Sequence, residues 1–198
     1  MAQKNISRLK TFVEQFTKLA DQQLPEAEIL RWGSILLKQL VVNDDWLPDE
    51  YAQPHPKYYQ QYLLYADPSA RFSVVSFVWG PGQVTPIHNH TVWGLVGVLR
   101  GAEYAQAYKE ENGSLIPDGE PVKMQPGDVE AVSPTVGDLH KVRNAFDDKV
   151  SISIHVYGAN IGEVNRSVFL EDGTEKPFIS GYSNTTPPDL EAVGGINN

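Results

Sequence analysis

Three histidines carry the strongest chemical signal in the sequence. His88 and His90 lie in the run PIHNHTVWG, and His140 follows in GDLHKVRN. Alternate side chains of a strand share a face, so His88 and His90 could bind one metal ion together, with His140 completing the site from another strand. Imidazole suits zinc, copper, iron and nickel, and three histidines plus water also form a known catalytic zinc site. The spacing therefore predicts a metal centre and leaves the metal open.

A second group of polar residues lies in the segment SISIHVYG. Ser153, His155 and Tyr157 alternate there with aliphatic residues. Same-face neighbours on a strand are roughly 7 Å apart, so His155 could contact both the Ser153 hydroxyl and the Tyr157 phenol. Nothing acidic orients this histidine in the sequence pattern, so the set is not a hydrolase triad. Composition alone favours a plainer interpretation, the polar outer face of an edge strand.

The elements that must position these residues are predicted to be mainly β. Apolar residues at helical spacing predict helices over the first 45 residues or so. Short runs rich in β-branched and aromatic residues then alternate with turn residues, which is typical of a sandwich or barrel. The predicted strands span residues 58–65, 71–79, 91–99, 102–108 and 149–157. We expect one domain, 1–198, with a helical part (1–45), a β-barrel core (57–170) and a C-terminal extension (171–198).

Composition narrows the classes of partner and location. The net charge of −9 argues against binding to nucleic acid or to anionic membranes. The chain has no cysteine, which excludes disulfides, cysteine-ligated metals and a cysteine nucleophile. Its first residues lack the apolar core of a signal peptide, and no segment reaches the length of a transmembrane helix. We expect a cytoplasmic protein, either a monomer or a small homo-oligomer.

Glycines and prolines around the histidines match a known pattern. The first cluster resembles the first motif of the cupin superfamily, and the residues around His140 resemble the second motif. This resemblance implies a cupin (jelly-roll) β-barrel with N-terminal α-helices. Many cupins carry a metal-binding glutamate a few residues after the second histidine, and Gly94 stands there in this chain. The resemblance therefore implies three neutral imidazoles and no carboxylate. The matching positions are Gly82, His88, His90 and Gly101, then Gly127, Pro134, Gly137, His140 and Asn144.

A narrower resemblance covers most of the chain, from about residue 58 to 169. The sequence is similar to the thiol dioxygenases, which include cysteine dioxygenase and 3-mercaptopropionate dioxygenase. PIHNHTVWG resembles the family's PIHDHT element, with Asn89 in place of the common aspartate. SISIHVYG resembles the strand whose Ser-His-Tyr triad lines the iron pocket in that family. The resemblance implies Fe²⁺ as the cofactor and Ser153, His155 and Tyr157 as catalytic residues.

Two further positions bear on the substrate. Arg166 matches an arginine that binds the substrate carboxylate in the bacterial branch of the family, and a guanidinium suits this role because it can clamp a carboxylate with two hydrogen bonds. Gln61 falls where cysteine dioxygenases carry a substrate-binding arginine, with Gln60 and Tyr62 as alternative alignments. A glutamine forms no ion pair, so the chain looks most like the bacterial 3-mercaptopropionate enzymes.

The resemblance implies a reaction and leaves rivals open. The reaction would add both atoms of O₂ to the sulfur of a small carboxylated thiol, 3-mercaptopropionate favoured, to give a sulfinic acid, a step in sulfur metabolism. Arg166 and Tyr157 would hold the carboxylate. Tyr157 would act as a free phenol, because the cysteine–tyrosine crosslink of animal cysteine dioxygenases needs a cysteine near Gly94. The alternatives are an L-cysteine dioxygenase, a zinc or manganese cupin, and a non-enzymatic cupin that binds a small molecule.

Overall fold

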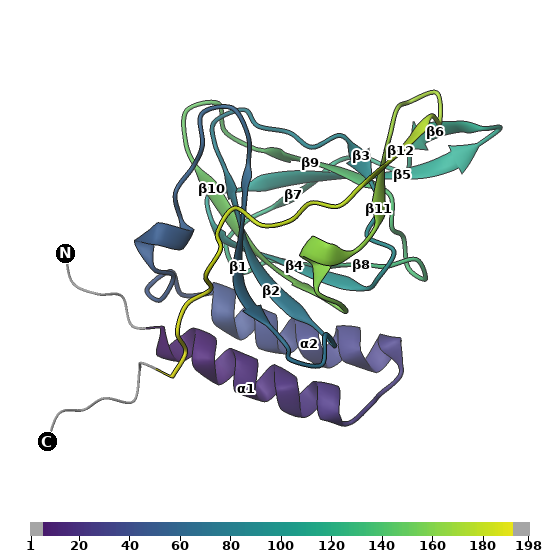
Figure 1. The fold of residues 1–198 in the computed structure, drawn as a ribbon. Coiled ribbons are helices and arrows are strands. Elements are labelled where there is room, and N and C mark those ends of the chain that lie inside the picture. The colour runs from purple at the N-terminus through teal and green to yellow at the C-terminus, as the bar shows by residue number, and fades with distance from the viewer. Residues whose placement is uncertain (1–5, 192–198) are drawn as a thin grey trace, which may run out of the picture.

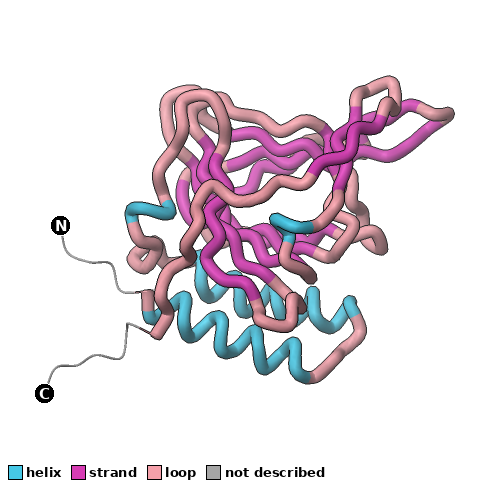
Figure 2. The backbone as a smooth tube through the Cα atoms, in the orientation of Figure 1, coloured by secondary structure: helices cyan, strands magenta, loops and turns pink. Residues whose placement is uncertain are grey.

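Two antiparallel sheets face each other, and two helices cover the outer face of one of them (Figures 1 and 2). The computed structural model describes residues 6–191. The helices are α1 (Ser7–Asp21) and α2 (Glu26–Val41), and two short 3-10 helices span Asp49–Tyr51 and Ile161–Glu163. Within the described residues, none of the helices is both long and apolar enough to cross a membrane.

The first sheet has the order β1-β2-β10-β4-β8, and the second has the order β12-β11-β3-β9-β5-β6, with β7 also paired to β5. The strands of the first sheet are β1 (Gln60–Ala66), β2 (Ser73–Trp79), β4 (Gly94–Arg100), β8 (Val129–Val132) and β10 (Ser151–Tyr157). Those of the second are β3 (Ile87–His88), β5 (Glu103–Glu111), β6 (Ser114–Pro117), β7 (Val122–Met124), β9 (His140–Asn144), β11 (Arg166–Phe169) and β12 (Glu175–Phe178).

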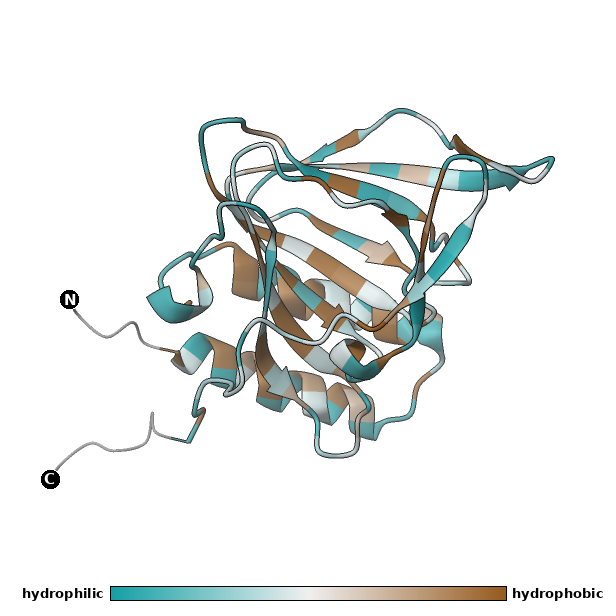
Figure 3. Ribbon diagram, turned by 45° about the horizontal axis from the view of Figure 1, so that its top comes forward, coloured by the Kyte–Doolittle hydropathy of each residue, from teal (hydrophilic) through white to brown (hydrophobic). Residues whose placement is uncertain are grey.

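The helices pack closely on the first sheet because two glycines leave room for them. A Cβ atom on Gly33 of α2 would lie 2.8 Å from Leu95 Cδ1 of β4. A Cβ atom on Gly97 of β4 would lie 3.0 Å from Leu37 Cγ of α2. The apolar face of α1, predicted from its spacing, is buried in the same core. Hydrophobic residues accordingly run along the sheet that lies over the helices (Figure 3).

The central strand β10 is buried on both faces. Its aliphatic residues pack in the core shared with the helices, and its polar residues face the space between the two sheets. Because β2 and β4 flank it, β10 is not the edge strand with a polar outer face that composition favours. Nor is it half-buried, since the helices cover one side and the second sheet covers the other. The polar side chains of β10 are therefore interior groups that need partners.

The predicted architecture, mainly β with N-terminal helices, is confirmed, although the two sheets are not closed into a barrel. The five predicted strands correspond to β1, β2, β4, β5 and β10. The prediction for 91–99 began too early, since Thr91 has a positive φ of 61° and β4 begins at Gly94. The other strands have two to five residues, too few to show a period.

The C-terminal segment joins both sheets. Strand β12 pairs with β11, and the Ser183 and Asn184 side chains accept hydrogen bonds at 2.9 and 2.8 Å from the backbone of β1. Up to residue 191, the predicted C-terminal extension therefore packs against the rest of the domain. Residues 1–5 of the predicted helical part and 192–198 of the extension lie outside the described residues.

Candidate metal centre

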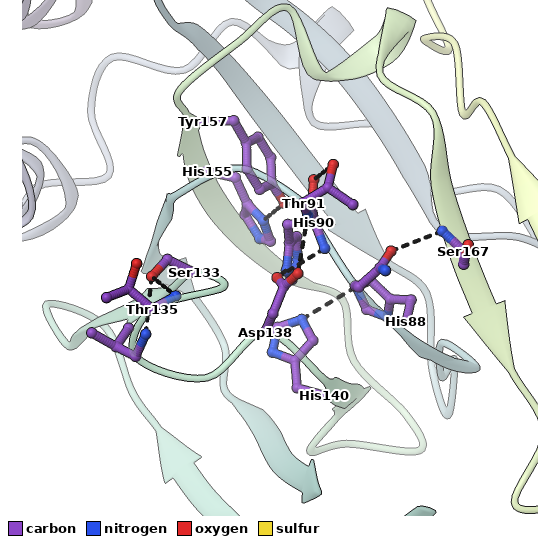
Figure 4. Close-up of polar contacts among 12 residues, drawn as sticks. His88, His90, Thr91, Ser133, Thr135, Asp138, His140, His155, Tyr157 and Ser167 are labelled. Carbon is purple, nitrogen blue, oxygen red and sulfur yellow. Dashed lines mark hydrogen bonds and ion pairs between the residues drawn. The ribbon is translucent and has the colours of Figure 1, made fainter. Parts of the chain in front are cut away.

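The structure brings the three predicted histidines together (Figure 4). His88 in β3 lies opposite His140 in β9, and their Nε2 atoms are 3.2 Å apart. One ligand atom from each of the three histidines lies within 4.8 Å of the others. Two nitrogens that each lie about 2.1 Å from one ion are about 3.0–3.4 Å apart at bond angles between square and tetrahedral. The donor set therefore fits one divalent metal ion.

His88 and His90 converge for a different reason from the one predicted. Strand β3 ends at His88, so the two residues do not alternate within one strand. His90 lies in the following turn, where Thr91 adopts a positive φ. The turn carries the His90 ring to 5.0 Å from the His88 ring and 4.7 Å from the His140 ring, measured between centroids.

A second ring of contacts orients two of the imidazoles. The His90 Nδ1–H donates to the Asp138 carboxylate at 2.9 Å, and that carboxylate also accepts the backbone N–H groups of His90 and Thr91 at 2.9 and 3.0 Å. The His88 Nδ1–H donates to the Pro86 carbonyl at 3.1 Å. With Nδ1 as the donor, Nε2 keeps its lone pair for a metal, as is typical of metal-binding histidines.

Asp138 was missed in the sequence, although it lies only two residues before the third histidine. An aspartate in a loop gives no signal of its own until the fold shows what it contacts.

The imidazoles are neutral at pH 7. Burial lowers the pKa of His88 to about 4 and lowers the pKa values of His90 and His140 well below the ordinary value. Each imidazole therefore has a lone pair available for a metal ion, and metal binding would not require the loss of a proton.

A cavity of about 280 Å³ adjoins the histidines. This volume suits a small molecule, because drug-sized ligands occupy about 300–1,000 Å³. Its lining includes His88, His140, His155, Tyr157, Arg166 and Gln61. Of the three candidates on β1, Gln61 is the one whose side chain reaches the cavity, since Gln60 donates to the carbonyls of residues 58 and 59 and Tyr62 donates to that of residue 53.

The polar side chains of β10 form a hydrogen-bonded row. Ser153 Oγ is 2.8 Å from His155 Nε2, and His155 Nδ1 is 2.7 Å from the Tyr157 hydroxyl. The His155 ring stacks on Phe77 with centroids 4.0 Å apart. A Cβ atom on Gly94 would lie 2.8 Å from Tyr157 Cδ1, so the glycine at this position leaves room for the phenol ring. The row fixes the phenol at the cavity wall.

Arg166 is buried, with 4% of its surface exposed. Its Nη2 donates to Ser180 Oγ at 2.7 Å, and its guanidinium carbon lies 4.7 Å from the centre of the Phe178 ring. Its Nε–H has no hydrogen-bond partner among the described residues, and the same holds for Gln61 Oε1. No described residue that lines the cavity is acidic. A buried cation without a counter-ion at a cavity wall is a site for an anion.

A second acid was also missed. Glu103, in β5, is 1% exposed, and its carboxyl group faces the Ser153 hydroxyl and the Trp79 indole. The prediction that nothing acidic orients His155 is not contradicted, because this ring contacts Ser153 and Tyr157, and the carboxyl group lies beyond Ser153. Sequence alone could not reveal it, because Glu103 belongs to the other sheet and lies 50 residues from Ser153.

Comparison with known proteins gives likeness of fold. No protein-family model matches the chain. A Klebsiella pneumoniae protein with a double-stranded β-helix domain is 20% identical, with a TM-score of 0.45 over 57% of this chain and 87% of its own. A cupin superfamily protein from Desulfitobacterium hafniense is 13% identical, with a TM-score of 0.44 over 60% and 94%. An oxalate oxidase bound to glycolate is 13% identical, with a TM-score of 0.40 over 53% of each chain.

The solved structures similar to this chain thus include cupins and an enzyme. The chemistry of this site has to be argued from its own side chains.

Proposed function

We propose that the protein is an iron-dependent thiol dioxygenase that converts a small carboxylated thiol and O₂ into a sulfinic acid, with 3-mercaptopropionate as the favoured substrate. The observation that carries this proposal is the Arg166 guanidinium, whose Nε–H has no hydrogen-bond partner among the described residues, at the wall of the same small cavity as His88 and His140. Such a cavity suits a molecule with an anionic group at one end and a metal-binding group at the other. A short carboxylated thiol has both groups.

The bound metal would be Fe²⁺, which supplies positions for a thiolate and for dioxygen and the redox chemistry that joins them. His88, His90 and His140 would hold it. Three neutral ligands leave the whole charge of the ion to stabilise an anionic sulfur. The spacing of the nitrogens also suits other divalent metals, so the choice of iron rests on the resemblance to thiol dioxygenases.

The remaining side chains would bind and orient the substrate. Arg166 would take the carboxylate through its free Nε–H and a neighbouring N–H, a bidentate arrangement. Gln61 and Tyr157 would add hydrogen bonds at the same wall. Holding the substrate at both ends would fix the distance from its sulfur to the metal, which replaces a random encounter with positioned reactants.

The lining also favours a thiol without an amino group. L-Cysteine carries an ammonium group that would need an acceptor or a carboxylate in the cavity. The described lining offers one permanent cation, Arg166, and no carboxylate. We therefore rank 3-mercaptopropionate above L-cysteine, and no nucleic acid, membrane or protein partner is needed for the reaction.

Oxygen uptake by the iron-loaded protein tests this function, with sulfinic acid measured by mass spectrometry. We expect uptake with 3-mercaptopropionate and a lower kcat/KM with L-cysteine. Zinc-loaded protein should show none. Thiol binding without uptake in fully iron-loaded protein would contradict the proposal and favour a cupin that only binds small molecules.

The substrate clamp is tested by Arg166→Ala. Loss of a charge-assisted hydrogen-bond pair should lower kcat/KM by roughly 10- to 100-fold, mainly through KM. Arg143→Ala is the matched control, because Arg143 is exposed and stacks on Tyr104 away from the cavity. Equal kcat/KM values for the two variants would exclude Arg166 as the clamp.

A further inference from the structure

Glu103 is a buried acid whose carboxyl group is unusual for its surroundings. It begins β5 with its side chain between the sheets, and neither carboxyl oxygen is hydrogen-bonded among the described residues. Its polar neighbours are the Ser153 hydroxyl and the Trp79 indole N–H. An unsatisfied buried carboxyl group destabilises a fold, and such groups occur where function requires them.

Contacts lead from Glu103 to the cavity. Ser153 Oγ accepts the Trp79 Nε1–H at 3.2 Å and lies 2.8 Å from His155 Nε2. His155 Nδ1 lies 2.7 Å from the Tyr157 hydroxyl, and Tyr157 lines the cavity. Every group between Glu103 and the cavity can both give and take a proton.

The protons of this row can be ordered in two ways. Burial keeps His155 neutral, so it has one N–H. If Glu103 is ionised, Ser153 donates to it, His155 donates to Ser153 through Nε2, and Tyr157 donates to His155. If Glu103 is protonated, the hydrogen bonds that join these four residues reverse, whereas Trp79 still donates to Ser153, and the Tyr157 O–H points into the cavity.

We infer that Glu103 is the proton-accepting end of a relay that runs from the cavity through Tyr157, His155 and Ser153. A thiol in the cavity gives its proton to the Tyr157 oxygen, and its sulfur keeps the electron pair as a thiolate. Tyr157 passes its own proton to His155 Nδ1, His155 passes the Nε2 proton to Ser153, and Ser153 passes its proton to the Glu103 carboxylate. The three middle groups end neutral, and Tyr157 now donates toward the thiolate.

The acidity of Glu103 matches this task. Burial raises its pKa to about 8, and the nearby Ser153 hydroxyl and Trp79 indole N–H act in the opposite direction. An ordinary thiol has a pKa of about 8.5, so donor and acceptor are close in proton affinity. Glu103 does not touch the substrate and acts through Ser153. The catalytic meaning of the relay rests on the proposed function, but the ordering of its protons does not.

The other titratable groups near the row do not change their protonation state over the pH range of interest. His88, His90 and Arg166 act on His155 electrostatically. Burial lowers the pKa values of both imidazoles and so favours their neutral forms, and the guanidinium stays protonated. A change in the row between about pH 6.5 and pH 9.5 would thus report Glu103.

The test is nitrogen-15 NMR of the metal-free protein with labelled histidine, because the ring nitrogens report which one carries the proton. His155 is assigned by comparison with His155→Gln. We expect Nδ1–H below about pH 8 and Nε2–H above it. Glu103→Gln and Glu103→Leu should each show one pH-independent tautomer. An unchanging tautomer in the natural protein, or a change that persists in Glu103→Gln, would overturn the relay.

A kinetic measurement separates the relay from the proposed function. In iron-loaded protein, Glu103→Gln should remove an ionisation near pH 8 from the pH profile and lower kcat about tenfold or more, with KM little changed. Glu110→Gln, exposed on the same strand, is the control and should leave both unchanged. A profile that Glu103→Gln leaves unaltered would refute the relay. The absence of oxygen uptake in the natural protein would refute only the dioxygenase, because the NMR result stands without it.

Discussion

Two acids lie on different sides of the site and differ in how they are held. The Asp138 carboxylate accepts three hydrogen bonds, from two backbone N–H groups and the His90 ring. Glu103 is 1% exposed and accepts none among the described residues. An acid surrounded by donors is a fixed acceptor, whereas an acid without donors is free to bind a proton. The hydrogen bonds of the metal region are thus fixed, whereas the hydrogen bonds of the Ser153–His155–Tyr157 region can reverse when Glu103 gains or loses a proton.

The largest expected effect is a loss of metal affinity when a histidine of the metal region is replaced, but not when His155 is replaced. His140→Ala removes a metal ligand and should weaken metal binding by more than the roughly 10- to 100-fold typical of outer contacts. His155→Ala should leave the affinity within about threefold, because His155 bonds to Ser153 and Tyr157 instead. Isothermal titration with Zn²⁺ measures both.

His55→Ala is the control, since His55 stacks on Tyr58 outside the cluster. Equal losses in His140→Ala and His155→Ala would show that the two regions are not separate.

The next effect is a change in how stability depends on pH. Folding raises the pKa of Glu103 from 4.5 to about 8, so the folded state holds a proton that the unfolded state has lost between these pH values. The contribution of this proton to the free energy of unfolding is therefore complete below about pH 4.5 and is lost as the pH rises to about 8. Glu103→Gln has no such proton. The free energy of unfolding of this variant, relative to that of the natural protein, should therefore increase by on the order of 3 kcal/mol from pH 5 to pH 8.

Urea denaturation at both pH values measures this difference. Glu110→Gln should show a constant difference from the natural protein, because its side chain is exposed. A constant difference for Glu103→Gln as well would mean that the buried carboxyl group is ionised in the folded protein.

The smallest of these effects concerns Asp138. Asp138→Ala removes the acceptor that orients His90 and should weaken metal binding by about 10- to 100-fold while leaving the His155 tautomer as it is. Asp148→Ala, exposed on the surface, should bind metal normally. If Asp138→Ala also shifted the tautomer, the acids would act on one shared network.

Much of the fold was predictable because periodicity is local. The spacing of Leu9, Phe12, Val13, Phe16 and Leu19 gave the buried face of α1, and long strands such as β2 and β10 were found from their composition. Strands such as β3, with two residues, were not, because they exist only through pairing with distant partners. The same holds for the burial of both faces of β10, which depends on helices more than 100 residues away.

The sequence by itself determined the kinds of chemistry available, because motifs such as PIHNHTVWG and SISIHVYG place imidazole, hydroxyl and phenol groups at fixed short spacings. Only the tertiary structure decided which groups meet. It left the Arg166 Nε–H without a hydrogen-bond partner among the described residues, set Asp138 behind His90, and placed Glu103 against Ser153 from the opposite sheet. The physical reason is that burial and partnership set the charge of an acid or a base, and both come from residues far apart in the chain.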